Sequence, residues 1–275
     1  MKKILIPLLL FLIAGCGMKP GSRGSLNEVI VFADPDVYGK CETGLSLALE
    51  KVIDTPQPEK VFHLKPVSYA KFADSTIATN IILLGTLEGD GPFSQFAREM
   101  LDENARRGIA EGVYWFFAKP NAWYNKQMLL VAIANDAEEL ASRLRFGTDD
   151  IYEVLNESVI ERTSKVMFSQ MENRKLAKEI REKYGFNLRI QHDYFLTRDE
   201  PEQRFVRIRR YQPTRWLTVS WQDADTLTGQ MLIDERARIS RLFADSSRIE
   251  PDYIKIEPDN HLADGKYLLR GLWAT

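Results

Sequence analysis

Residues 28–36 read EVIVFADPD, a run of β-branched and aromatic residues that ends in turn-forming residues. The run predicts a buried strand, because such side chains pack well on a pleated surface, and the Asp-Pro-Asp predicts the turn that closes it. The following segment, 43–52, has apolar residues at Leu45, Leu49 and Val52, which is a helical spacing. The folded part of the chain is thus predicted to begin with a strand and a helix.

The same two patterns continue toward the carboxyl terminus. Apolar runs predict strands over 61–64, 80–85, 113–118 and 128–134, with helices over 93–106 and after Asp136. A charged stretch over 149–185 has its apolar residues on one helical face and ends in glycine, so it predicts one long helix. A hairpin of strands over 188–196 and 205–210 follows, then strands over 216–221, 253–256 and 267–273, with a helix over 231–243 between 216–221 and 253–256.

The regions before and after the long helix have their elements in the same order. The matching aspartates Asp34 and Asp223 are 189 residues apart, the prolines Pro66 and Pro258 are 192 apart, and the glycines Gly85 and Gly271 are 186 apart. These similar spacings indicate an internal duplication, although strand-helix-strand order is also common by chance. We predict an α+β fold with mixed or antiparallel sheets, helices packed on one face, and two related halves joined by a long helix.

The amino terminus has the features of a secretory signal. Two lysines, Lys2 and Lys3, precede an apolar run over 4–14, which is too short to cross a bilayer as a helix. The run ends in Ile13-Ala14-Gly15-Cys16, which resembles the lipobox of bacterial lipoproteins. The alternative is an ordinary signal peptide in which Cys16 has no special role.

The lipobox resemblance implies cleavage before Cys16, a diacylglycerol thioether on its sulfur and an acyl chain on its amine. Several chains matter, since each buried methylene contributes roughly 0.8 kcal/mol to membrane binding and one chain alone binds weakly. Gly17 is not the aspartate that retains some lipoproteins at the inner membrane, so we expect attachment at the outer membrane of the cell envelope.

These boundaries divide the chain into five predicted segments. They are a signal peptide (1–15), a lipidated tether (16–26), a first α+β half (27–148), a connecting helix (149–185) and a second α+β half (186–275).

Composition limits the classes of partner and chemistry. The chain has 275 residues and a formal net charge of −2, which does not favour nucleic acid. With Cys16 lipidated, Cys41 is the remaining cysteine, so no intrachain disulfide is expected. We expect Cys41 to be a partly buried small residue and not a nucleophile, and we expect no cofactor.

The chain also resembles a family of Bacteroidetes lipoproteins, domain of unknown function 4837. The likeness rests on the lipobox, on Asn27-Glu28-Val29-Ile30-Val31, on Pro56-Gln57-Pro58 and on Leu269-Arg270-Gly271-Leu272-Trp273. It covers nearly the whole mature chain and implies an exported, lipid-anchored α+β protein. It implies no catalytic residues.

Two Asp-x-Asp pairs, Asp34 with Asp36 and Asp223 with Asp225, follow predicted strands. Carboxylates in that position often face a ligand crevice, and hard cations bind several such oxygens. The alternative is that they are turn and helix-cap residues, and Leu227 stands where a third oxygen ligand would be needed in the second pair. We therefore predict no established metal site and keep the pairs as candidate ligands.

Arginines and aromatic residues offer further candidate contacts. Strand alternation places Arg207 and Arg209 on one face, which would suit an anionic group, or would simply be a solvated face that protects an edge strand. Four of the five tryptophans fall in predicted strands and are expected in the core. Trp123, beside Tyr124 in a predicted turn, is expected to be an exposed contact.

No catalytic set is convincing. Ser46 lies in Gly44-Leu45-Ser46-Leu47-Ala48, which approximates a nucleophile elbow but lacks the preceding strand. The histidines His63, His192 and His261 have no metal-binding spacing. We therefore predict a non-enzymatic envelope lipoprotein that binds an envelope protein, a glycan or another ligand. The alternative is a lipid-anchored, metal-dependent hydrolase.

Overall fold

The computed structural model describes residues 19–53, 57–169, 171–223, 225–242, 248–258 and 267–274. The predicted signal peptide, Cys16, Pro56 and His261 lie outside the described residues. The chain divides into two compact units. The first contains the described residues up to Ile53 together with Lys60–Arg162, and the second contains those of Asp54–Glu59 and Thr163–Thr275.

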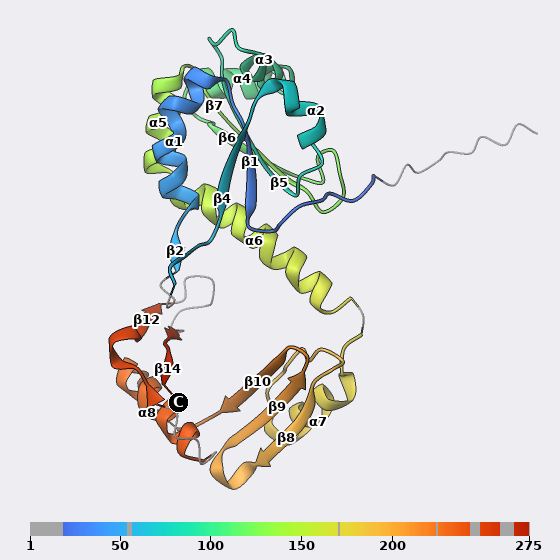
Figure 1. Ribbon diagram of the computed structural model, residues 1–275, viewed down its shortest axis with the longest axis vertical. Helices are drawn as coiled ribbons and strands as arrows, with labels where there is room; N and C mark the ends of the chain where they lie inside the picture. Colours follow the sequence, from blue (N-terminus) through green and yellow to red (C-terminus); the bar gives the residue numbers. More distant parts are fainter. Residues whose placement is uncertain are drawn as a thin grey trace, which may run out of the picture. The chain divides into compact units, whose positions relative to one another are not determined.

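The first unit is built on a five-stranded sheet of order β4-β1-β5-β7-β6 (Figure 1). Its strands are β1 (Glu28–Phe32), β4 (His63–Val67), β5 (Asn80–Thr86), β6 (Phe116–Pro120) and β7 (Met128–Ala134). Four of them are parallel, and β6 pairs antiparallel with β7 at one edge. A short pair, β2 (Val52–Ile53) with β3 (Glu59–Lys60), leads from the first helix toward β4.

The sheet has apolar side chains on both of its faces, and helices cover each face. On one face lie α1 (Pro35–Leu49), α5 (Ala137–Phe146) and the start of α6 (Thr148–Met167), packed on residues such as Val31 and Ile82. On the other face lie the short helices η1 (Tyr69–Lys71), α2 (Phe72–Ser75), α3 (Pro92–Glu99) and α4 (Glu103–Ala110) (Figure 1). The aromatic rings of Phe32, Phe72 and Phe93 contact one another in this second layer.

The α+β class is confirmed, with mixed and antiparallel sheets. The expectation that helices pack on one face is corrected for the first unit. All seven residues of β5 and all seven of β7 are buried. Parallel strands in the middle of a sheet have apolar residues on both sides, and each side needs its own helical layer.

Two predicted helices are each two helices in the structure. The predicted helix 93–106 ends after α3 and restarts as α4, where the Asp102 carboxylate accepts the Ala105 N–H at 2.7 Å. The predicted helix 149–185 is divided into α6 and α7 (Arg174–Tyr184), and the Asn173 side chain caps α7 through the Leu176 N–H. A polar side chain that caps a helix satisfies backbone donors that helix continuation would have used. Among the described helices, none has the length and apolar character needed to cross a bilayer.

The second unit contains a three-stranded antiparallel sheet of order β10-β9-β8. Its strands are β8 (Phe195–Glu200), β9 (Phe205–Tyr211) and β10 (Thr214–Ser220), with η2 (Pro201–Gln203) in the first turn. Leu176 and Ile180 of α7 pack on Ile208 of this sheet. The remaining described elements are α8 (Gly229–Leu242), η3 (Pro251–Tyr253), the pair β11 (Arg248–Ile249) with β14 (Trp273–Ala274), and the pair β12 (Lys255–Pro258) with β13 (Tyr267–Arg270).

The described residues do not repeat one topology in the two halves. In the first half β1 lies between two parallel partners, β4 and β5. In the second half the corresponding strand, β10, pairs antiparallel with β9, and β12 pairs antiparallel with β13. Among the described residues, the strand pairing of the first half is therefore not repeated in the second.

Candidate functional site

The carboxyl ends of β1 and β5 form the place where open sheets of this kind usually bind ligands, because connections diverge there to the two sides of β1. Asp34 follows β1 and is 2% exposed. Its Oδ1 accepts the backbone N–H of Phe93 at 3.0 Å, and its Oδ2 accepts that of Ser94 at 2.9 Å. A carboxylate of the chain itself thus occupies the anion position at the amino terminus of α3.

The loop after β5 closes the same crevice. Nη1 of Arg98 donates to the carbonyl oxygens of Thr86, Leu87 and Gly89 at 2.8, 3.2 and 2.5 Å. A Cβ on Gly91 would lie 2.1 Å from Cγ of Asp34, so the close approach of loop and carboxylate requires glycine there. Among the described residues, the Phe93 and Ser94 N–H groups at the start of α3 are therefore already bonded to a carboxylate of the chain.

The candidate metal ligands do not converge in the structure. Asp34 is a helix cap, and Asp36 is exposed in the first turn of α1. In the second unit Asp223 forms a 2.8 Å ion pair with Arg204, and Asp225 is exposed. Within the described ranges, no three histidine, cysteine, aspartate or glutamate side chains group together as a metal would require.

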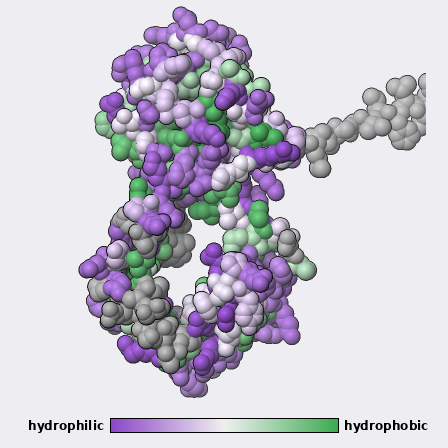
Figure 2. Space-filling model, in the orientation of Figure 1, coloured by the Kyte–Doolittle hydropathy of each residue, from purple (hydrophilic) through white to green (hydrophobic). Residues whose placement is uncertain are grey.

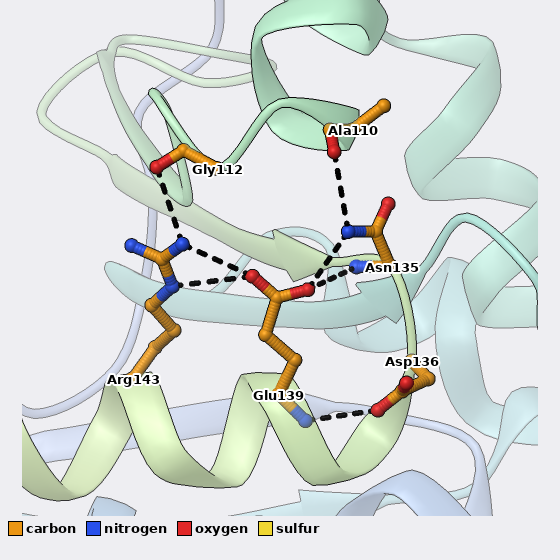
Figure 3. A network of polar contacts seen from close by, with 6 residues as sticks. All are labelled: Ala110, Gly112, Asn135, Asp136, Glu139 and Arg143. Atoms are coloured by element: carbon orange, nitrogen blue, oxygen red, sulfur yellow. Dashed lines mark hydrogen bonds and ion pairs between the residues drawn. The ribbon is translucent and has the colours of Figure 1, made fainter.

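A polar network lies at the carboxyl end of β7, which neighbours β5 on the side opposite β1 (Figure 3). The Glu139 carboxylate accepts two hydrogen bonds from Asn135, one from the backbone N–H at 3.2 Å and one from the side-chain Nδ2 at 2.9 Å. The same carboxylate forms an ion pair with Arg143 at 3.0 Å. Arg143 also donates to the carbonyl of Gly112 at 3.1 Å. Burial alone would raise the pKa of Glu139, but the bonds from Arg143 and Asn135 outweigh it and lower that pKa. Every link joins groups of the same unit, so the network is structural.

The lowered pKa of Glu139 predicts how this network responds to acid. We expect Glu139→Gln to lower the free energy of unfolding at pH 7 by about 1 kcal/mol, since the ion pair is partly exposed. A carboxylate with a lowered folded-state pKa stabilises the fold above its unfolded value, here 4.5, and loses that effect as the pH falls further. Urea unfolding at several pH values should therefore show the difference between wild type and variant shrinking below about pH 4.5.

The neighbouring Glu138→Gln is the matched control. Its side chain is 75% exposed and pairs with Lys40 at the surface, so a smaller effect is expected. A difference for Glu139→Gln that stays constant down to about pH 3 would contradict the assigned role.

The candidate nucleophiles Cys41 and Ser46 and the described histidines have structural surroundings that do not form a catalytic set. Cys41 is fully buried in the core of the first unit, where burial raises the pKa of its thiol to about 12, so it is protonated at neutral pH. Ser46 lies within α1, and its hydroxyl donates to Glu50 at 2.8 Å. His63 is exposed on the edge strand β4, and His192 is exposed in the second unit.

Arg207 and Arg209 lie on one face of β9, as strand alternation predicts. Their guanidinium carbons lie 5.3 and 5.0 Å from the ring centroid of Trp216 on β10, and Arg209 lies 4.7 Å from that of Tyr211. Trp216 is 51% exposed, so its expected place in the core is wrong, because β10 is an edge strand. The two arginines are thus packed on aromatic rings of their own sheet, and a role in anion contact stays a prediction.

An open groove lies at the β4 edge of the first unit, on the face covered by α2 and α3. Its volume is about 610 Å³, and Ile30, Val67 and Ile77 are among the apolar residues that line it. Three cationic side chains border it, those of Arg23, Lys65 and Lys71, together with the Ser68 and Ser75 hydroxyl groups and the Glu28 carboxylate. Glu28 lies 3.5 Å from Lys65, which leaves two positive charges in excess.

The groove was not found from the sequence. Arg23 lies within the predicted tether, and Lys71 lies between two predicted strands. Tertiary structure brings them together because Arg23 forms a bridge with Ala78, the residue two before β5. Two isolated cations 48 positions apart give no motif that a sequence pattern could reveal.

The first unit is a doubly wound sheet of mixed strand direction, with a filled crevice at its carboxyl edge and an open cationic groove at its β4 edge. The chain belongs to the family described as Domain of unknown function (DUF8532), whose model matches residues 22–168, or 147 of 275 residues. The match includes all three cations of the groove. This family differs from domain of unknown function 4837, and the resemblance to the latter stays a prediction. Neither the curated proteins nor the solved structures provide a match.

Proposed function

We propose that this protein is a lipid-anchored component of the bacterial cell envelope, attached through Cys16, whose first unit binds an anionic ligand in the groove of Arg23, Lys65 and Lys71. The anchor is supported by the lipobox-like Ile13-Ala14-Gly15-Cys16. The binding role is supported by the groove, the observation that carries this proposal. The protein is proposed to act by binding and not by catalysis.

Charge and access favour an anion. Neither the Arg23 guanidinium nor the Lys71 ammonium forms a side-chain hydrogen bond or ion pair among the described residues, so both are available to a ligand. Guanidinium and ammonium groups bind phosphate and carboxylate oxygens through charge-assisted hydrogen bonds, which are stronger than neutral ones. Two hydroxyl groups at the border of the groove add donors of the kind that orient such a ligand.

A titration tests the binding proposal. Inorganic pyrophosphate and glucuronate serve as soluble probes, and vesicles with phosphatidylglycerol serve as a lipid source of the same charge. We expect the double variant Arg23→Glu with Lys71→Glu to weaken binding of the preferred probe at least about tenfold, because two attractive charges become repulsive. Isothermal titration calorimetry measures the soluble probes, and co-sedimentation measures the vesicles.

Arg107→Glu is the matched control for this experiment. Arg107 is an exposed residue of α4 in the same unit and does not line the groove, so reversing its charge should leave binding within about twofold. Equal loss in the control and the groove variant, or no binding of any probe by the wild type, would contradict a specific anion site.

A substitution at Cys16 tests the anchor. We expect Cys16→Ser to move the protein from the membrane fraction to the soluble fraction, because it removes the sulfur that carries diacylglycerol and each buried methylene contributes roughly 0.8 kcal/mol. Fractionation after a salt wash measures this. A Cys16→Ser protein that is cleaved normally and stays with the membrane would exclude lipid attachment as the anchor.

A further inference from the structure

Residues 19–25, predicted as part of a free tether, are bound to the first unit. Nζ of Lys19 donates to the carbonyl oxygens of Asn121 and Ala122 at 2.7 and 2.8 Å. Nδ2 of Asn125 donates to the carbonyl oxygen of Lys19 at 2.5 Å. The backbone N–H of Ser22 donates to the carbonyl oxygen of Asn125 at 2.9 Å. The described chain therefore begins as an extended segment held by the turn between β6 and β7 (Figure 1).

A second contact holds the other end of this segment. The backbone N–H of Arg23 donates to the carbonyl of Ile77 at 2.9 Å, and Arg23 forms a parallel bridge with Ala78. Bonds at both ends leave residues 19–23 no freedom to act as a flexible spacer. We name residues 19–25 the docked segment.

The docked segment limits how far the body can lie from its anchor. Lys19 lies three positions after Cys16, and three extended steps along the chain span at most about 11 Å. A free tether over 16–26 would instead have reached about 30 Å. The surface next to Lys19 must therefore stay close to any lipid that Cys16 carries.

The side chains of that surface suit a lipid headgroup layer. Trp123 and Tyr124 are half-buried in the β6–β7 turn, and the ring of Trp123 lies 6.2 Å from those of Phe72 and Phe96. A shallow pocket beside these rings is lined by Trp123, Tyr124 and Pro20 of the docked segment. Tryptophan and tyrosine are enriched at the membrane–water interface, since each has an apolar body and a polar end.

The charge of the surface is also suitable. Lys19, Lys119 and Lys126 are exposed there, and no acidic residue occurs in 17–27 or in 112–135. The exposed Asp74 of α2 is the acidic group of the neighbouring helix. A lysine near an anionic membrane surface contributes about 1 kcal/mol. Figure 2 shows hydrophilic and hydrophobic residues mixed on the visible surface where the described chain begins.

We propose that the first unit lies on the membrane with the docked segment and the β6–β7 turn, residues 121–127, against the lipid headgroups. This orientation rests on the proposed lipid attachment and adds to it a defined face. The carboxyl edge of the sheet, with Asp34 and the loop after β5, then points away from the lipid. A seven-residue strand such as β5 separates the two edges by about 20 Å.

Site-directed labelling of the full-length lipidated protein tests the orientation. Lys119→Cys introduces a thiol at the end of β6 beside the turn, and Glu88→Cys introduces one after β5 at the opposite edge. Both positions are exposed, and Cys41 is buried, so a maleimide fluorophore labels the new thiol. The protein is reconstituted in vesicles of phosphatidylethanolamine and phosphatidylglycerol, with and without lipids that carry a nitroxide on the headgroup.

We expect the nitroxide lipids to quench the label at position 119 at least about threefold more strongly than the label at 88, because nitroxide quenching acts over a short range. Similar quenching at both positions, with the protein still bound to vesicles, would overturn the orientation while leaving lipid attachment intact. Protein that does not bind vesicles would instead refute the attachment itself.

A longer linker provides the matched second variant. About ten glycine and serine residues inserted after Gly17 extend the reach of the anchor by up to roughly 35 Å and leave the docked segment unchanged. We expect this variant to stay with the vesicles and to lose most of the difference in quenching. An unchanged difference would show that the short, docked connection is not what orients the unit.

Discussion

Replacing Asp34 with alanine is expected to lower the free energy of unfolding of the first unit by about 3 kcal/mol. The substitution leaves the N–H groups of Phe93 and Ser94 buried without an acceptor. Each unsatisfied buried donor costs about 1 to 3 kcal/mol, and the lost bonds are charge-assisted. The same change removes the carboxylate against which Gly91 and its loop pack. Asp34→Asn keeps one acceptor and should cost about half as much.

The thiol of Cys41 reports this unfolding directly. In a Cys16→Ser background it is the single thiol of the chain, and it becomes reactive to a disulfide reagent when the core of the first unit opens. Asp36→Ala is the control, because Asp36 is also an aspartate, lies two positions later and is exposed. We expect it to lower the free energy of unfolding by less than about 1 kcal/mol. Equal effects at positions 34 and 36 would rule out the capping of α3 as the role of Asp34.

Replacing Arg162 with leucine is expected to cost about 3 kcal/mol as well. Arg162 of α6 is 8% exposed and donates to the carbonyls of Thr79 and Lys126 at 3.1 and 3.0 Å and to the Asn80 side chain at 2.5 Å. Burial lowers the pKa of the guanidinium, which nevertheless stays charged at neutral pH. Leucine removes the donor, so the acceptors on Lys126 and Asn80 lose this bond and the Thr79 carbonyl keeps only the N–H of Met128 at 2.9 Å.

Two further variants separate this role from a general effect of charge. Arg162→Lys keeps the charge but not the planar fork, so it should recover only part of the loss. Arg107→Leu makes the same substitution at an exposed arginine of α4 and should change stability by less than about 0.5 kcal/mol. If Arg162→Leu is as stable as Arg107→Leu, the three hydrogen bonds do not hold α6 to the sheet.

Both predictions concern polar residues that the sequence patterns assign to other roles or leave out. Asp34 stands at the N-cap position of α1, which sequence reasoning kept as one interpretation, but its carboxylate caps α3, 59 and 60 residues later in the chain. Arg162 falls inside a charged helical stretch and has no feature that distinguishes it from its exposed neighbours. The partner of each side chain depends on which elements meet.

For the candidate sites too, the sequence predicts local features but not those that depend on which elements meet. Sequence reasoning predicts the shared face of Arg207 and Arg209, because alternation along a strand is a local property. It does not predict that Trp216 belongs to an edge strand, because edge and centre differ only in the order of strands. Nor does it predict the groove, whose cations come from separate segments of the chain.

Local chemistry in the sequence was enough to identify the strands of the first sheet, the helix caps at Asp136 and Gly185, and the α+β class, because periodicity and capping act over a few residues. The association of distant segments settled the rest. The covering of both sheet faces, the capture of α3 by Asp34 and the docking of Lys19 on residues 121 and 122, more than a hundred positions away, all arise from tertiary packing. Buried polar groups bond to whichever partners the packed elements bring near, and no pattern of neighbouring residues encodes that choice.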